Sequence, residues 1–159
     1  MKRSQLREHL FCMLFRSGFY EKEELDEQIA FYFEALVKRD YKAPAIVAGE
    51  NGQDEIDEFF GRLNKPNQKE REELTVKFKN IVDKMEELDE RIAVNSEGWS
   101  LNRIGKADLT ILRLATYEII FDEDVPTGVA IDEAVELAKR FAGDKGPSFI
   151  NGVLSKIAG

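Results

Sequence analysis

Apolar side chains recur every three or four residues along most of the chain, a spacing typical of amphipathic helices. One stripe runs through residues 6–14 and a second through residues 25–37. A third, longer stripe predicts one helix, and its members are Leu74, Phe78, Ile81, Val82, Met85, Leu88 and Ile92. No segment alternates with period two for long enough to predict a sheet. The pattern therefore predicts an all-α protein.

The last third of the chain predicts three further helices. Residues 106–121 carry apolar side chains on nearly every face, which is typical of a central helix surrounded by others. The segment IDEAVELAKRFAG predicts an amphipathic helix that ends at Gly143, and Pro147 suits the first turn of a last helix. Gly152 falls in the middle of that last helix, where either a close helix crossing or a tolerated defect accounts for it.

Turn and breaker residues, among them Pro44, Gly49 and Pro66, mark the segment between the second and third stripes. A connection this long is unusual in a compact helical domain unless it contains structure of its own. A short amphipathic helix is predicted inside it from Ile56, Phe59, Phe60 and Leu63. The character of the sequence changes again after Asn95.

Composition narrows the class of protein. The chain has 159 residues, 43% of them hydrophobic, which suffices for one compact domain or two small lobes. No stretch approaches the roughly 18 apolar residues of a membrane span, and charges interrupt any signal peptide at the N-terminus. We therefore expect a soluble, cytoplasmic protein without a membrane partner.

Catalytic and metal sites have little support in the sequence. Cys12 is the only cysteine and His9 the only histidine, so neither a disulfide nor a Cys/His zinc set is predicted. Cys12 is expected in the core and His9 on a helix surface. Neither a calcium loop nor a nucleotide-binding glycine motif is present. We predict no enzyme activity, catalytic residue, metal or cofactor.

Charge is unevenly distributed along the chain. The net charge of -8 disfavours nucleic-acid binding by the chain as a whole. Residues 1–20 nevertheless hold four basic side chains against one acidic, whereas residues 21–90 hold 11 basic and 20 acidic. Arg3 and Arg7 share one helical face with Lys2 beside them. They form either a solvated helix end or a phosphate contact, for which guanidinium groups are well suited.

Four pieces of the C-terminal half follow one another in a characteristic order, namely ILRLATYE, the DVP turn, VAIDEAVELAKRF and SFINGVLSKIA. In order and spacing they resemble the C-terminal half of the NusB family of transcription antitermination factors. The N-terminal RSQLREHLFCMLF also resembles the family's arginine-containing first helix. The resemblance covers residues 2–39 and 69–159, whereas residues 40–68 are longer and more acidic than the family's usual connection.

The resemblance implies a single all-helical domain over residues 1–159 that consists of two small lobes. The N-terminal lobe would span residues 1–95, with the acidic insertion near 40–68, and the C-terminal lobe residues 96–159. NusB proteins pair with NusE, a small-subunit ribosomal protein, on single-stranded boxA RNA. Within the RNA polymerase antitermination complex, the pair promotes read-through of terminators, notably in ribosomal RNA operons.

The resemblance also implies site residues. RNA contacts are expected at the start of the first helix and in the turn before the last one: Lys2, Arg3, Arg7, Lys145, Ser148 and Phe149. The ring of Phe149 is expected to stack on an unpaired base, with a core position as the alternative. Asp108 is expected to face NusE or to stabilise a helix N-terminus, and Phe15 to lie at the partner interface or in the core. Arg113 is expected to form a buried ion pair.

Two other functions remain open from the sequence. NusB-like domains form the N-terminal part of some ribosomal RNA methyltransferases, so a truncated enzyme of that kind is one alternative. A helical adaptor without strong RNA binding is the other, because Ser4 and Gln5 stand where the family often has further basic residues. Fewer cations predict weaker and less salt-sensitive RNA binding.

Overall fold

The computed structural model describes residues 1–17, 21–38 and 53–159, and they form helices and connecting segments with no strand among them. The predicted all-α class is therefore confirmed. The chain divides into two compact units, Met1–Val82 and Asp83–Gly159. No helix within the described ranges is long and apolar enough to cross a membrane.

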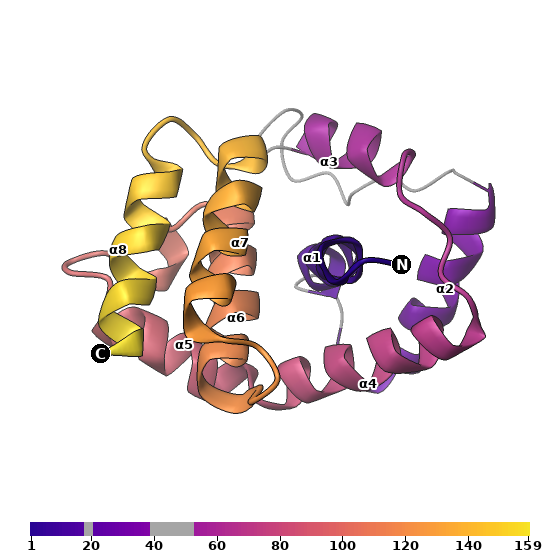
Figure 1. Ribbon diagram of the computed structural model, residues 1–159, viewed down its shortest axis with the longest axis horizontal. Helices are drawn as coiled ribbons and strands as arrows, with labels where there is room; N and C mark the ends of the chain where they lie inside the picture. Colours follow the sequence, from indigo (N-terminus) through magenta and orange to yellow (C-terminus); the bar gives the residue numbers. More distant parts are fainter. Residues whose placement is uncertain (18–20, 39–52) are drawn as a thin grey trace. The chain divides into compact units, whose positions relative to one another are not determined.

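The first unit contains the α-helices α1 (Arg3–Ser17), α2 (Leu25–Lys38), α3 (Gln53–Phe60) and α4 (Gln68–Asp83), and the short 3-10 helix η1 (Lys22–Glu24). In Figure 1 the view runs along α1, with α2, α3 and α4 around it. Every residue from His9 to Phe15 is buried, so α1 is covered on all sides. It is the central helix of this unit.

The short helix predicted in the connection between the stripes is confirmed as α3. Its apolar positions, together with the leucine three residues after its end, are buried: Ile56, Phe59, Phe60 and Leu63. The ring of Phe60 packs edge-on against Tyr32 of α2, with ring centroids 5.4 Å apart. The rest of the predicted acidic insertion, residues 40–52, lies outside the described residues.

The third apolar stripe forms two helices and not the single helix that its spacing predicts. The turn at Lys84, with φ -93° and ψ 4°, separates α4 from α5 (Met85–Val94). The division between the units falls at this same point, after Val82. One continuous stripe thus serves two cores: Leu74, Phe78 and Ile81 are buried in the first unit, and Leu88 and Ile92 in the second.

The start of α4 is defined by a reciprocal cap. The Glu70 backbone N–H donates to Asn67 Oδ1, and the Asn67 backbone N–H donates to Glu70 Oε1, both at 2.8 Å. This arrangement satisfies two backbone donors that would otherwise lack partners. The amino group of Met1 pairs with Glu70 Oε2 at 2.9 Å, and this contact ties the N-terminus of the chain to α4.

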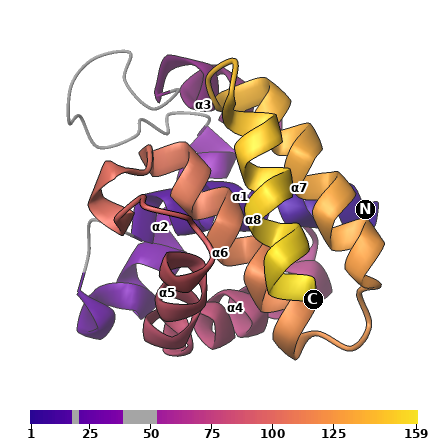
Figure 2. The ribbon, with the colours of Figure 1, turned by 90° about the vertical axis from the view of Figure 1, so that its left-hand side faces the viewer.

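The second unit contains α5, the 3-10 helix η3 (Leu101–Arg103), α6 (Lys106–Phe121), α7 (Thr127–Phe141) and α8 (Gly146–Ala158). Helix α6 contacts α5, α7 and α8, and α7 packs along α8, as Figure 2 shows. The predicted central position of residues 106–121 is confirmed for this unit. The second unit begins at Asp83, earlier than the boundary after residue 95 that the sequence suggests. It begins earlier because α5 packs on α6 and α8 and so belongs to this unit. The lobes 1–95 and 96–159 stay a prediction.

Candidate nucleic-acid interface

The first turn of α1 presents two cations. Lys2 and Arg3 are exposed, with 80% of the Arg3 side chain accessible to solvent. The Arg3 guanidinium lies 3.2 Å from Glu73 Oε1 of α4, and this carboxylate is itself about half exposed. An exposed ion pair of this kind is weak, so phosphate can compete with Glu73 for the guanidinium.

Arg7 occupies a different environment from Arg3, although the two residues are one helical turn apart. Its residue exposure is only 7%. The face of α1 that is exposed at Arg3 is therefore buried one turn later, at Arg7. The sequence pattern places both arginines on one side of a helix but contains no information on how deeply that side is buried. The phosphate contact of Arg7 stays a prediction, and its accessibility is far lower than that of Arg3.

The predicted surface position of His9 is wrong, because the ring is fully buried. Its Nδ1 lies 2.7 Å from the Tyr32 hydroxyl, and its Nε2 lies 2.7 Å from the backbone carbonyl oxygen of Asn64. Both ring nitrogens thus have partners, as a buried polar group requires. His9 joins α1 to α2 and to the segment after α3. The sequence signal for the burial of His9 was the uninterrupted apolar run that follows it in α1.

Cys12 and Phe15 lie in the core of the first unit. Cys12 is completely buried, as predicted, and burial raises the pKa of its thiol. Phe15 is 2% exposed, and its ring packs against Phe11 with centroids 6.2 Å apart. Of the two positions expected for Phe15, the structure favours the core. A buried ring offers little surface to a partner.

The second cluster of predicted residues lies at the start of α8. Lys145 is the N-terminal cap residue, and the Phe149 backbone N–H donates to its carbonyl oxygen at 3.0 Å. Lys145 and Ser148 are exposed, and Phe149 is half-buried. No side chain in the described part of the chain caps this helix by a hydrogen bond, so its first turn carries a partial positive charge next to Lys145.

Phe149 contacts an aromatic residue that the sequence analysis did not identify. The Trp99 ring meets the Phe149 ring edge-on, with centroids 6.2 Å apart and planes inclined by 64°. Trp99 is 52% exposed, in the segment between α5 and η3. The available signal was a single tryptophan among polar residues directly after the turn residues Asn95–Gly98.

Asp108 lies beside the start of α8, in the first turn of α6. A Cβ atom placed on Gly146 would lie 3.8 Å from both carboxylate oxygens of Asp108. The carboxylate is half-buried, and burial raises its pKa above the ordinary value. This position supports the alternative in which Asp108 stabilises a helix N-terminus, and the helices concerned are both α6 and α8.

Arg113 forms the predicted ion pair, although the pair is partly and not fully buried. Its Nε donates to Asp89 Oδ1 at 2.7 Å and its Nη2 donates to Asp89 Oδ2 at 2.9 Å. The neighbouring Lys106 has its pKa lowered to about 8, mainly by burial and then by the Arg113 charge, while Asp89 opposes the shift. This cluster joins α5 to α6 and is structural.

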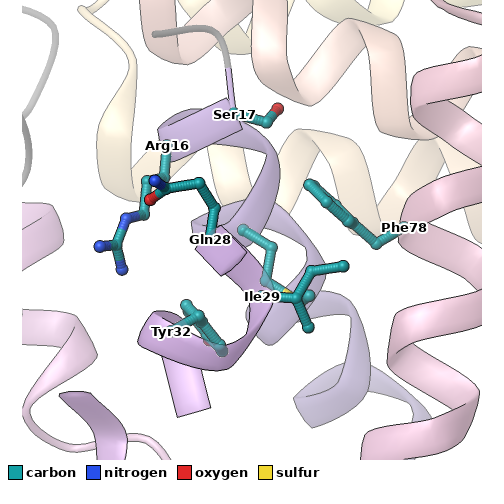
Figure 3. Close-up of a pocket in the computed structure, with 7 residues that line it drawn as sticks. Arg16, Ser17, Gln28, Ile29, Tyr32 and Phe78 are labelled. Carbon is teal, nitrogen blue, oxygen red and sulfur yellow. The ribbon is translucent and has the colours of Figure 1, made fainter. Parts of the chain in front are cut away.

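Each unit has a cavity among its described residues. The one in Figure 3 has a volume of about 10 Å³, and it lies among α1, α2 and α4. Its lining includes Gln28, whose Oε1 has no hydrogen-bond partner among the described residues. Such a volume holds one water molecule and no larger ligand.

An open depression of about 540 Å³ between α7 and α8 is lined in part by Asp132, Glu136 and Ser148. Its carboxylates would repel phosphate.

Metal binding has no candidate in the described ranges. No group of three or more histidine, cysteine, aspartate or glutamate side chains there is placed to hold an ion. This part of the chain has two exposed cations at the start of α1, and one exposed cation with an aromatic pair at the start of α8. These features define a helical protein whose candidate sites suit the binding of nucleic acid.

Comparison with known proteins identifies the family. A model of the NusB family matches residues 39–159. Transcription antitermination protein NusB of Lachnoclostridium phytofermentans is 45% identical over 157 residues, which are 99% of this chain and 98% of the relative. The chain therefore belongs to the NusB family, and the resemblance found in the sequence is confirmed.

Solved structures agree with this assignment. NusB from T. maritima is 30% identical with a TM-score of 0.61, over 99% of this chain and 92% of that protein. A structure described as the antitermination factors NusB and NusE in complex with double-stranded RNA has a TM-score of 0.67. It is 23% identical, over 98% of this chain and 95% of that chain, and so supports the fold alone.

Proposed function

We propose that this chain is a transcription antitermination factor that binds RNA together with NusE and so promotes read-through by RNA polymerase. The observation that carries the proposal is the 45% identity over 98% of a relative named transcription antitermination protein NusB. The proposed role consists of binding and requires no catalysis or cofactor. A factor of this kind meets nascent RNA in the bacterial cytoplasm, which is the location we propose.

The RNA contacts that we propose come from each unit separately. In the first unit, the exposed Lys2 and Arg3 would contact phosphates, whereas the buried Arg7 is less suited to do so. In the second unit, Lys145 would contact phosphate, Ser148 would donate a hydrogen bond and Phe149 would stack on a base. The exposure of Lys145 and Ser148 and the partial exposure of the half-buried Phe149 support these roles.

NusE is the partner that we propose for this chain. A chain of net charge -8 repels RNA at long range, and a basic ribosomal protein would offset that field. Asp108 is a candidate contact because part of its carboxylate is accessible, although it also lies against the start of α8. Phe15 stays a weaker candidate because of its burial. An Asp108→Asn variant would separate a partner contact, seen as weaker NusE binding, from a structural role, seen as a lower melting temperature.

An adaptor without strong RNA binding is the alternative favoured by one observation. Arg7 is buried and Arg3 is paired with Glu73, which leaves few free cations at the start of α1. The methyltransferase alternative has less support, because the relative that matches this chain over 98% of its own length is named as an antitermination protein.

The proposed RNA contact at α1 is tested by the salt dependence of binding. Labelled boxA RNA would be titrated with the chain and NusE at several salt concentrations. Arg3→Ala should weaken binding to boxA and to scrambled RNA alike and reduce the salt slope by about 0.7, the contribution of one single-strand phosphate. Lys38→Ala is the matched control, since this exposed cation is likewise paired with a glutamate, Glu34, at 2.7 Å. An unchanged slope for Arg3→Ala would contradict the contact.

A further inference from the structure

Trp99 is held in place on the surface of the second unit. The backbone of Glu97 and Gly98 has φ values of +33° and +80°, and the backbone N–H of Trp99 donates to the Ser96 carbonyl oxygen at 3.1 Å. This tight turn projects the indole outwards. Two contacts connect the turn to α8, namely the ion pair between Glu97 and Lys156 and the ring contact between Trp99 and Phe149. The segment lies beside α8 in Figure 1.

The two rings leave aromatic surface accessible. In an edge-on pair only one ring presents a face to the other, so part of the π surface stays available to a further ring. Trp99 is 52% exposed and Phe149 is half-buried. An exposed aromatic surface next to cations is a candidate interaction site.

Two exposed cations lie close in sequence to the ring pair. Lys145 lies one helical turn before Phe149, and Arg103 ends the 3-10 turn that follows Trp99. Both are exposed, and neither forms an ion pair within the described part of the chain. The carboxylates of Asp132 and Glu136 border the side of α8 that contains Ser148 and Asn151. Phe149 lies about 100° around the helix from Ser148, so the aromatic side is separate from this acidic depression.

We propose that Trp99 and Phe149 together form a stacking site for an unpaired base of RNA, with Lys145 and Arg103 contacting the flanking phosphates. The proposal rests on the proposed function and adds Trp99 and Arg103 to its RNA-binding residues. Aromatic platforms with adjacent cations bind single strands because every base has a π face and every linkage a charge. Paired bases are stacked inside a duplex and are not available to such a site.

The experiment uses the fact that Trp99 is the only tryptophan in the chain. Its fluorescence would be followed while the full chain, mixed with NusE, is titrated with single-stranded boxA RNA. The anisotropy of labelled RNA would report binding independently. Trp99→Phe would supply the fluorescence background from NusE. Quenching that saturates together with anisotropy is expected for the single strand, and no quenching for a duplex of the same sequence.

Variants test whether the stacking contributes to affinity. Trp99→Leu should weaken RNA binding about 5- to 150-fold, the range for one stacked base, without changing the salt slope. Trp99→Phe should bind with intermediate affinity. Val94→Ala is the matched control, because Val94 is 78% exposed in the same unit and should not affect RNA binding. If Trp99→Leu unfolds, as judged by circular dichroism, the fluorescence quenching of the unmodified chain still decides whether Trp99 stacks on the RNA.

Three results would overturn the proposal in different ways. RNA binding without quenching and with full affinity of Trp99→Leu would refute the stacking site and leave the proposed function intact. A Trp99→Leu variant that binds NusE more weakly but RNA unchanged would assign the aromatic pair to a protein interface. Absence of RNA binding by every mixture would refute both the stacking site and the proposed function.

Discussion

Arg113 on α6 and Asp89 on α5 form a two-point ion pair, with N–O distances of 2.7 and 2.9 Å. Their side chains are 15% and 24% exposed, so the pair lies between a surface and a fully buried ion pair. Removal of one partner should therefore cost more than the roughly 0–1 kcal/mol of a surface pair. It should cost less than the roughly 3–5 kcal/mol of a fully buried one.

Asp89→Asn tests this estimate, because it keeps the shape of the side chain and removes the charge. Urea unfolding should show a loss of stability within the stated range. Glu136→Gln is the control, since it breaks an exposed pair in which the Glu136 side chain is 66% exposed and that of Lys139 is 58% exposed. Equal losses for the two variants would contradict a structural role for the Arg113–Asp89 pair.

Gly146→Ala should destabilise the second unit. The added Cβ would lie 2.3 Å from the Cβ of Ala142, a contact that neither atom can relieve by rotating a side chain. Such overpacking costs about 1–3 kcal/mol and should displace the start of α8, which carries Lys145 and Phe149. A lower melting temperature and weaker RNA binding are expected. An unchanged melting temperature would show that the contact between α7 and α8 is more adaptable than described.

Gly152→Ala should have the opposite effect in the same helix. Apart from its own helix backbone, no atom of the described residues lies within 4 Å of the position of its Cβ, so the close helix crossing considered from the sequence is wrong and the glycine is a tolerated defect. Replacing a helical glycine by alanine should raise stability by about 1 kcal/mol. The check is thermal or urea unfolding, and a destabilised Gly152→Ala would refute this interpretation.

Lys106 predicts a pH dependence of stability. Its pKa is lowered from the ordinary 10.5 to about 8, mainly by burial. Between these two values the unfolded chain binds the proton more tightly than the folded one, so stability rises with pH through this window. Lys106→Met should remove that rise. The unfolding midpoints of the two proteins, compared from pH 7 to pH 10.5, measure it, and parallel profiles would contradict the lowered pKa.

Regular apolar spacing predicted most of the helices. The buried faces of α2, α3 and α6 follow from their sequence patterns, because spacing within one helix is a local property. The break at Lys84 could not be predicted in this way, since no proline or glycine marks it and the apolar stripe continues through it. Its cause is tertiary: the residues on its two sides belong to different cores.

The candidate site was predicted less completely than the fold. Arg3 and Arg7 have the same spacing signal but very different exposure, and His9 is buried by contacts with Tyr32 and Asn64 that are distant in sequence. Trp99 gained its significance only from its contact with Phe149. Burial and long-range contacts depend on how helices pack, and a local pattern does not contain that information.

The most direct test of the account is the affinity for boxA RNA of the chain alone, of NusE alone and of their equimolar mixture, each measured in the same salt. We predict weak binding by the chain alone because of its net charge of -8. The mixture should bind boxA more tightly than either component and more tightly than scrambled RNA. A mixture that binds boxA no better than NusE alone would contradict the central claim.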